Sequence, residues 1–316
     1  MARCFVTREL PGPALDRLRS RHEVEVWPER LPPAPAELAS RAAPAEGLLT
    51  TLNDRVDAAL IEHCAGLRVI SNYAVGHDNI DLAAAAARRI AVGNTPDVLT
   101  EATADLTFAL LLAAARKLPE AIASVREGDW LTWEPSRYLG QAVGGATLGI
   151  VGLGRIGNAV AQRALGFGMT VLYTGGGPGP DSISRVPLDR LLAEADFVSL
   201  HCPLTRATRR LIDADALARM RSNAILINTS RGPIVDPDAL RVALVEGQIA
   251  GAALDVTDPE PLPADDPLLS APGLIVVPHI GSATRAAREQ MAELAVENLL
   301  AGLEGRPMPH EVRVAV

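Results

Sequence analysis

The chain has 316 residues, of which 48% are hydrophobic and 22% charged, a composition typical of a folded globular protein. This length exceeds that of a domain with a single hydrophobic core, so we expect two domains. Its net charge of −8 argues against nucleic acid or an anionic membrane as an obligatory partner. Three cysteines without a CxxC pair, and a start that lacks a secretory signal, indicate reduced thiols and a cytoplasmic location.

The first third of the chain predicts short strands that alternate with helices. The expected strands are 3–7, 24–27, 47–52, 68–74 and 90–94, and the expected helices are 13–20, 36–41 and 56–64. This alternation is typical of a parallel sheet with right-handed crossovers. The segment therefore predicts one complete small α/β domain.

A different kind of segment follows, with a long apolar helix predicted over 100–117. Thr100 can cap this helix, and almost every position from Leu106 onward is apolar, so we expect burial on most of its circumference. Its most apolar run is too short to span a bilayer. The next segment, 125–139, places aromatic residues among charges. That composition fits either a subunit interface or aromatic plugs beneath a loop.

The motif Gly-x-Gly-x-x-Gly occupies 152–157, between an apolar strand at 146–151 and a helix predicted at 155–165. Gly152 permits a tight turn, Gly154 lets a pyrophosphate approach the backbone, and Gly157 lets helix and strand pack closely. The phosphates are expected on the N–H groups at the positive end of the helix. In this context the motif favours a dinucleotide site over a structural glycine loop.

After the motif the alternation resumes and completes a six-stranded, doubly wound domain. The further strands are expected at 170–174, 197–202, 224–229, 250–256 and 274–278, and the helices at 188–195, 214–220, 237–246 and 284–303. The last helix leaves the nucleotide domain and could return to the first one.

Three complementary polar groups follow three strands of this second sheet, at the edge where such sheets bind ligands. They are Arg231, Glu260 and His279. Hydride transfer to a carbonyl places negative charge on oxygen, which requires a proton donor and a positive neighbour. We expect His279 to donate the proton, Glu260 to hold its other ring nitrogen, and Arg231 to bind a carboxylate or polarise the carbonyl. The sequence offers no metal-ligand cluster for a rival chemistry.

Several stretches resemble the D-isomer-specific 2-hydroxyacid dehydrogenase family, and within it most closely the glyoxylate/hydroxypyruvate reductases. The matching stretches are 72–81, 95–100, 152–157, 228–232, 254–263 and 278–284. The resemblance implies a Rossmann dinucleotide-binding domain (99–284) inserted in a flavodoxin-like substrate domain (1–98 with 285–316). It also implies NAD(P)H-dependent reduction of glyoxylate or hydroxypyruvate to the D-2-hydroxy acid, with Arg231, Glu260 and His279 as the catalytic residues.

The same resemblance implies further site residues. The backbone N–H groups of Val75 and Gly76, together with Arg231 and Ser282, would bind the substrate. A homodimer would form through residues 100–140, from which Trp133 of one subunit would reach the neighbour's substrate pocket. The positions that match cofactor-lining residues are Gly152, Leu153, Gly154, Arg155, Ile156, Gly157, Thr174, Gly175, Gly176, Pro203, Thr229, Asp255 and Gly281.

The end of the second strand of this domain departs from the pattern of an NAD enzyme. An Asp or Glu that binds the ribose diol is expected there, but none occurs between Gly157 and Asp181. The Arg that similar NADPH-using reductases carry just after Thr-Gly is Gly176 in this chain. Thr174, the glycine amides and Arg185 could still bind a 2′-phosphate. We therefore predict NADPH over NADH as the cofactor, without a metal.

Two alternative functions are consistent with the sequence. A D-2-hydroxyacid dehydrogenase could act on another substrate, such as a longer 2-oxo acid, or oxidise formate or phosphite. A dinucleotide-sensing, corepressor-like binding protein would keep the three polar residues without needing turnover. Activity with any small 2-oxo acid distinguishes the enzyme from the sensor.

Overall fold

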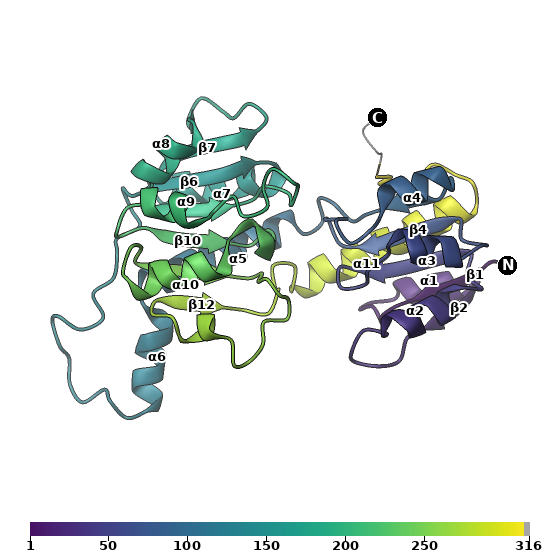
Figure 1. The fold of residues 1–316 in the computed structure, drawn as a ribbon, viewed down its shortest axis with the longest axis horizontal. Coiled ribbons are helices and arrows are strands. Elements are labelled where there is room, and N and C mark those ends of the chain that lie inside the picture. The colour runs from purple at the N-terminus through teal and green to yellow at the C-terminus, as the bar shows by residue number, and fades with distance from the viewer. Residues whose placement is uncertain (313–316) are drawn as a thin grey trace. The chain divides into compact units, whose positions relative to one another are not determined.

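The computed structural model describes residues 1–312, which divide into two compact units (Figure 1). The first unit comprises Met1–Leu99 and the C-terminal segment that begins at Ala283, and the second comprises Thr100–Ser282. No helix in the described part of the chain is long and apolar enough to cross a membrane.

The first unit is built on a five-stranded parallel sheet in the order β2-β1-β3-β4-β5. Its strands are β1 (Arg3–Val6), β2 (Glu23–Val26), β3 (Gly47–Thr51), β4 (Val69–Tyr73) and β5 (Ala91–Gly93). This 2-1-3-4-5 order is that of the flavodoxin-like doubly wound fold, which confirms the predicted fold class.

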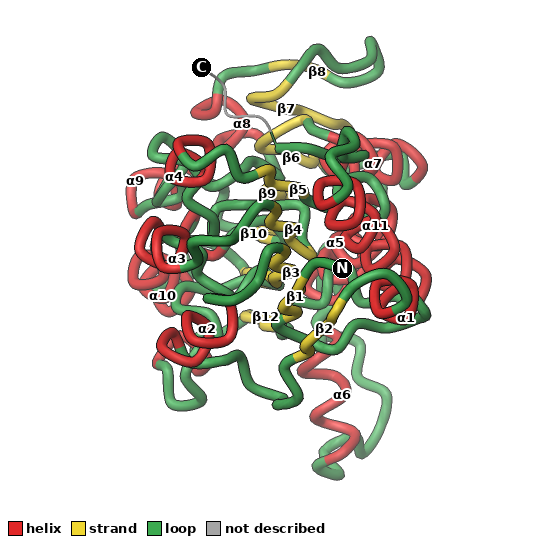
Figure 2. Tube along the Cα trace, turned by 90° about the vertical axis from the view of Figure 1, so that its right-hand side faces the viewer, coloured by secondary structure: helices red, strands yellow, loops and turns green. Residues whose placement is uncertain are grey.

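Helices cover both faces of this sheet (Figure 2). They are α1 (Ala14–Arg19) and α11 (Arg285–Leu303) on one face, and α2 (Pro35–Ala42), α3 (Ala58–His63) and α4 (Leu82–Ala87) on the other. Neighbouring strand residues alternate between the two layers. Val6 packs with the α1/α11 layer and Phe5 with the α2/α3/α4 layer, which makes both strand faces apolar.

The second unit contains a seven-stranded parallel sheet in the order β12-β11-β10-β9-β6-β7-β8. Its strands are β6 (Thr147–Leu153), β7 (Thr170–Gly176), β8 (Ser184–Arg185), β9 (Phe197–Leu200), β10 (Ile225–Asn228), β11 (Gly251–Leu254) and β12 (Leu274–Val276). Counted from β6, this is the Rossmann order 3-2-1-4-5-6 with one more strand at the edge. The prediction of six strands was wrong by one, because β8 has only two residues and shows no periodicity.

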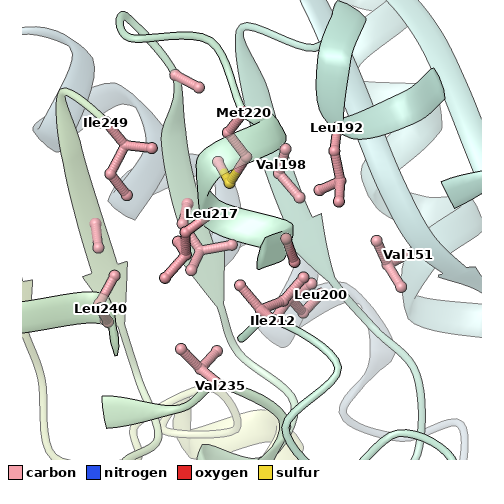
Figure 3. Close-up of a cluster of buried hydrophobic side chains, with 14 of the residues drawn as sticks. Val151, Leu192, Val198, Leu200, Ile212, Leu217, Met220, Val235, Leu240 and Ile249 are labelled. Carbon is pink, nitrogen blue, oxygen red and sulfur yellow. The ribbon is translucent and has the colours of Figure 1, made fainter. Parts of the chain in front are cut away.

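Helices also cover both faces of the second sheet (Figure 2). They are α5 (Thr100–Ala115) and α7 (Arg155–Gly166) on one face, and α8 (Leu188–Glu194), α9 (Ala214–Arg219) and α10 (Pro237–Val245) on the other. Figure 3 shows the core beneath the latter three, where Leu192, Leu217 and Leu240 pack with Val198 and Leu200 of β9. Burial of each such side chain stabilises the fold by roughly 1.5–3 kcal/mol.

The long apolar helix ends two residues earlier than predicted, at Ala115. Lys117 then adopts a left-handed backbone (φ 50°), after which a second, unpredicted helix, α6 (Leu118–Arg126), begins. In Figure 1, α6 and the loop that follows it project away from the sheet of their own unit.

Candidate active site

The glycine motif has the geometry that a dinucleotide site requires. Gly152, in β6, has φ +100°, and a Cβ there would lie 2.6 Å from the backbone nitrogen of Cys202. A Cβ on Gly157, in the first turn of α7, would lie 2.4 Å from the Gly152 oxygen. By contrast, apart from Gly154 and its two chain neighbours, no residue of the described part of the chain lies within 4 Å of a Cβ built on Gly154, the N-cap of α7. The backbone there is open to a pyrophosphate, beside the helix N-terminus.

The end of β7 is held close to this motif, since the pairing of β6 and β7 continues as far as Leu153 with Gly176. Gly176 has φ +82°, and a Cβ there would lie 2.6 Å from the Leu153 oxygen. A side chain at position 176 therefore meets both a strained backbone conformation and a steric clash. This explains why glycine, and not arginine, follows Thr174-Gly175 in this chain.

The two-residue strand β8 places Arg185 beside the middle of β7, in register with Tyr173. The loop between the two strands is held by Tyr173, whose hydroxyl accepts a hydrogen bond of 2.8 Å from the N–H of Gly179. Arg185 is exposed. An exposed cation thus lies on the strand next to β7, whose end carries a run of glycine N–H groups where a cofactor ribose would lie.

The structure brings His279 and Glu260 into direct contact. Nδ1 of His279 lies 2.5 Å from Oε1 of Glu260, and the two side chains are 24% and 30% exposed. Oε2 of Glu260 accepts a longer hydrogen bond, 3.4 Å, from the N–H of Thr257. His279 has a left-handed backbone (φ 51°), and its N–H donates to the Asp255 carbonyl at 2.9 Å.

Arg231 follows β10, the strand next to β11, while Glu260 follows β11 and His279 follows β12. In register, Asn228 pairs with Leu254 and Leu254 with Val276, so the loops that carry the three residues leave the sheet at the same edge. The Arg231 guanidinium donates to the Ser230 carbonyl at 2.8 Å.

Asp255 supports the loop that carries His279. Its carboxylate is 1% exposed and accepts from the N–H groups of Ile280, at 2.6 Å, and Gly281, at 2.8 Å. Burial raises the pKa of Asp255, while these two N–H groups and His279 oppose the rise. Both oxygens of this predicted cofactor-lining residue thus also fix the backbone beside the imidazole, a role that sequence reasoning missed.

The other predicted cofactor residues are scattered around the same edge of this sheet. Thr229 is buried, and its hydroxyl shares a 2.9 Å hydrogen bond with that of Thr107 in α5. Pro203 is exposed in the loop after β9. The side chains that surround the glycine motif are buried Leu153, half-buried Ile156 and exposed Arg155.

The predicted substrate-binding residues lie in different parts of the chain. Val75 and Gly76 form the turn after β4 in the first unit, whereas Ser282 ends the second unit. Trp133 lies in the loop after α6 and is 80% exposed. No group of three or more His, Cys, Asp or Glu side chains in residues 1–312 could hold a metal ion.

His201 is a second histidine near the motif that sequence reasoning missed. It follows β9, and its Nε2 lies 2.8 Å from the hydroxyl of Ser199. Burial lowers the pKa of His201 to about 4, so the ring is neutral at pH 7.

Comparison with known proteins agrees with this geometry. Residues 108–281 match the family model of the D-isomer specific 2-hydroxyacid dehydrogenase, NAD binding domain. The chain is 48% identical to a glyoxylate reductase of Korarchaeum cryptofilum, over 99% of this chain and 96% of that protein. It is 44% identical to the human glyoxylate reductase/hydroxypyruvate reductase, over 99% and 98%.

Solved structures with the same fold cover nearly the whole chain. A crystal structure of a protein from Thermus thermophilus has a TM-score of 0.94 and 54% identity, over 98% of this chain and 100% of that one. An NADPH-dependent glyoxylate/hydroxypyruvate reductase from Sinorhizobium meliloti, in complex with NADP and malonate, has a TM-score of 0.87 and 32% identity, over 100% and 99%. The fold and the motif define an oxidoreductase with a Rossmann NAD-binding domain. More narrowly, the chain belongs to the D-isomer specific 2-hydroxyacid dehydrogenase family.

Proposed function

We propose that the protein reduces a small 2-oxo acid, glyoxylate or hydroxypyruvate, to the D-2-hydroxy acid at the expense of NADPH. The observation that carries this proposal is the 2.5 Å contact between His279 and Glu260, in the same unit as an open glycine motif. The relatives named glyoxylate reductase support the choice of substrate.

The chemical step needs a proton at the carbonyl oxygen of the substrate. Nicotinamide supplies the hydride when the cofactor is bound. Because Glu260 occupies Nδ1 of His279, the other nitrogen, Nε2, is left to donate the proton to the developing alkoxide. The Glu260 carboxylate stabilises the positive charge of the imidazolium before transfer and fixes the orientation of the ring. In the reverse direction the same Nε2 accepts the proton.

A positive group is also required where charge develops. Arg231 supplies a planar, permanently charged guanidinium at the same edge of the sheet, which polarises the carbonyl and attracts the substrate carboxylate. We assign the backbone N–H groups of Val75 and Gly76 to the carboxylate as well, with Ser282 as a further substrate-binding residue. These assignments rest on the family resemblance.

The preference for NADPH rests on the charge around the end of β7. No carboxylate lies between Gly157 and Asp181 to repel a 2′-phosphate, and exposed Arg185 stands beside the strand. The test is the ratio of kcat/KM for NADPH and NADH with glyoxylate. A clear preference for NADH would contradict this part of the proposal.

We also propose that the protein forms a homodimer through residues 100–140. Half of the large hydrophobic side chains exposed in the described residues lie between Leu118 and Leu139, including Trp130, Leu131 and Trp133, which are 68%, 86% and 80% exposed. An exposed apolar patch of this kind is typical of a protein interface. In such a dimer Trp133 would reach the neighbouring subunit's substrate pocket.

The function is tested with a panel of 2-oxo acids against both cofactors. The proposal predicts that glyoxylate and hydroxypyruvate are the best substrates and that hydroxypyruvate yields D-glycerate. A preference for a longer 2-oxo acid would indicate that the protein has another activity of the family. Cofactor binding without turnover of any member of the panel would indicate a sensor.

A further inference from the structure

The turn after β4 is tied to the first unit through its carbonyl groups. The Val75 carbonyl accepts a hydrogen bond of 2.7 Å from Nδ2 of Asn94, and the Gly76 carbonyl accepts one of 2.9 Å from Nδ2 of Asn72. The backbone N–H groups of Val75, Gly76 and His77 donate to no acceptor within residues 1–312. The acceptors of the turn are therefore paired, while its donors are available to an anion.

Both asparagines are themselves held in place by other polar groups. Asn72 is fully buried in β4, where its Oδ1 accepts from the Thr50 hydroxyl at 3.1 Å and its Nδ2 also donates to Oδ1 of Asn79 at 3.0 Å. A backbone carbonyl can only accept, so the Asn72 atom that faces Gly76 must be the nitrogen. The orientation of this amide is thus determined by its partners.

Asn94 follows β5 and is half-buried. Its own carbonyl accepts a hydrogen bond of 2.8 Å from Nδ2 of Asn298, a fully buried residue of α11. Oδ1 of Asn298 in turn accepts from the N–H of His310 at 3.0 Å. A second buried amide therefore positions the backbone from which the Asn94 side chain reaches the turn.

Because the peptide group is planar, a hydrogen bond that fixes a carbonyl also fixes the N–H group of the next residue. The carbonyl of Val75 and the N–H of Gly76 belong to one trans peptide unit and point in opposite directions. A bond that fixes the Val75 oxygen therefore also fixes the direction of the Gly76 N–H. In the same way, the bond from Asn72 to the Gly76 oxygen fixes the direction of the His77 N–H.

We propose that Asn94 and Asn72 are positioning residues for substrate binding, which hold the Gly76 and His77 N–H groups toward the substrate carboxylate. The proposal rests on the function proposed above, in which this turn binds that carboxylate. It adds His77, through its backbone N–H, as a third donor. Fixed backbone donors stabilise a bound carboxylate without the entropy cost of ordering a loop.

The test compares a substrate that carries the carboxylate with one that lacks it. Glyoxylate and glyoxal have the same reactive aldehyde, but only glyoxylate has a carboxylate for the turn. In Asn94→Ala and in Asn72→Ala we expect kcat/KM for glyoxylate to fall about tenfold, mainly through KM, as expected for loss of one hydrogen bond to a carbonyl. The value for glyoxal should stay within about twofold of wild type.

Ser71→Ala is the matched control, because it removes a buried hydrogen bond of the same unit, from the Ser71 hydroxyl to the Ala295 carbonyl at 2.7 Å, and not one to the turn or to either asparagine. It should lower the thermal midpoint while leaving the ratio of the two substrates within about twofold of wild type. Equal losses for glyoxylate and glyoxal in Asn94→Ala, or no loss with glyoxylate, would overturn the proposal. Asn94 is only half-buried, so this variant decides the question even if Asn72→Ala does not fold.

The inference can also be tested if the protein lacks the proposed reductase activity. If the wild-type protein reduces no 2-oxo acid, calorimetric binding of oxamate to the NADPH-loaded protein replaces kinetics. The inference then predicts about tenfold weaker oxamate binding in Asn94→Ala than in the control Ser71→Ala. Equal oxamate affinity in the two variants would overturn it, as would a wild-type protein that binds no oxamate.

Discussion

Nδ1 of His279 lies 2.5 Å from Oε1 of Glu260, although the two residues belong to loops that follow different strands, β12 and β11. Two further features hold the imidazole in this position. The His279 N–H donates to the carbonyl of Asp255, and the Asp255 carboxylate holds the N–H groups of the next two residues. The ring is therefore oriented before any substrate binds, and Nε2 is the nitrogen left for chemistry.

Replacement of Glu260 by glutamine should preserve the shape of this contact and remove its charge. A neutral amide stabilises the imidazolium less well, so kcat should fall about 10²-fold, within the range of general acid–base catalysis. The dissociation constant for NADPH, measured by fluorescence, should not change. A Glu260→Gln variant with a kcat within twofold of wild type would show that the carboxylate has no catalytic role.

Alanine at position 176 should destabilise the cofactor-binding unit. Gly176 has φ +82° and a Cβ there would lie 2.6 Å from the Leu153 oxygen, so Gly176→Ala should cost about 1–3 kcal/mol and weaken cofactor binding. Gly177→Ala is the control, because no described residue other than its two chain neighbours lies within 4 Å of a Cβ at that position. Thermal midpoints of both variants are the measurement. Equal midpoints would refute the steric argument.

His201 should make stability depend on pH in a defined window. Burial lowers the pKa of His201 to about 4, below the value of about 6.5 for an unfolded chain, so the unfolded state binds the extra proton first. The contribution of neutral His201 to the free energy of unfolding is fully present above pH 6.5 and decreases as the pH drops toward 4. The total loss is at most about 3 kcal/mol, since each pKa unit corresponds to about 1.4 kcal/mol.

The thermal midpoint of the wild type should therefore fall more between pH 7 and pH 5 than that of His201→Gln. His63→Gln, which replaces an exposed histidine, is the control and should behave as wild type. If wild type and His201→Gln lose the same number of degrees, burial of His201 does not contribute to acid sensitivity.

A charge introduced in the loop after α6, within the proposed interface 100–140, should prevent formation of the proposed dimer. Leu131 is 86% exposed, so Leu131→Asp should leave the fold of the subunit intact while placing a carboxylate in an apolar interface. Light scattering should give twice the chain mass for the wild type and a single chain mass for the variant. Leu31→Asp, at a leucine of the first unit that is 74% exposed, should remain dimeric. A monomeric wild type would contradict the proposed assembly.

Regular elements with a strong local pattern could be predicted from the sequence to within two residues. Strand β10 was expected at 224–229 and occupies Ile225–Asn228, because a buried parallel strand is a short apolar run between turn signals. Helix α4 was missed since its sequence, Leu-Ala-Ala-Ala-Ala-Ala, has no alternation of apolar and polar positions. Its start is marked only by Asp81, whose side chain accepts from the N–H of Ala84.

Those residues of the candidate site that lie in loops after neighbouring strands could be predicted from the sequence. Arg231, Glu260 and His279 each lie in the loop that follows a strand, so a sheet with those strands as neighbours brings their loops to one edge. The asparagines that hold the turn after β4 could not be found in this way. Asn72 lies inside an apolar strand, and the partners that give it a role are contributed by other segments of the chain.

The central claim is that His279 transfers the proton during reduction of a 2-oxo acid by a nicotinamide cofactor. Its most direct test is kcat for glyoxylate at saturating NADPH, followed by loss of the reduced cofactor, in wild type and His279→Ala. We predict measurable turnover in the wild type and a fall of about 10²- to 10⁴-fold in the variant, with the affinity for NADPH unchanged. Near-normal turnover by His279→Ala would contradict the account.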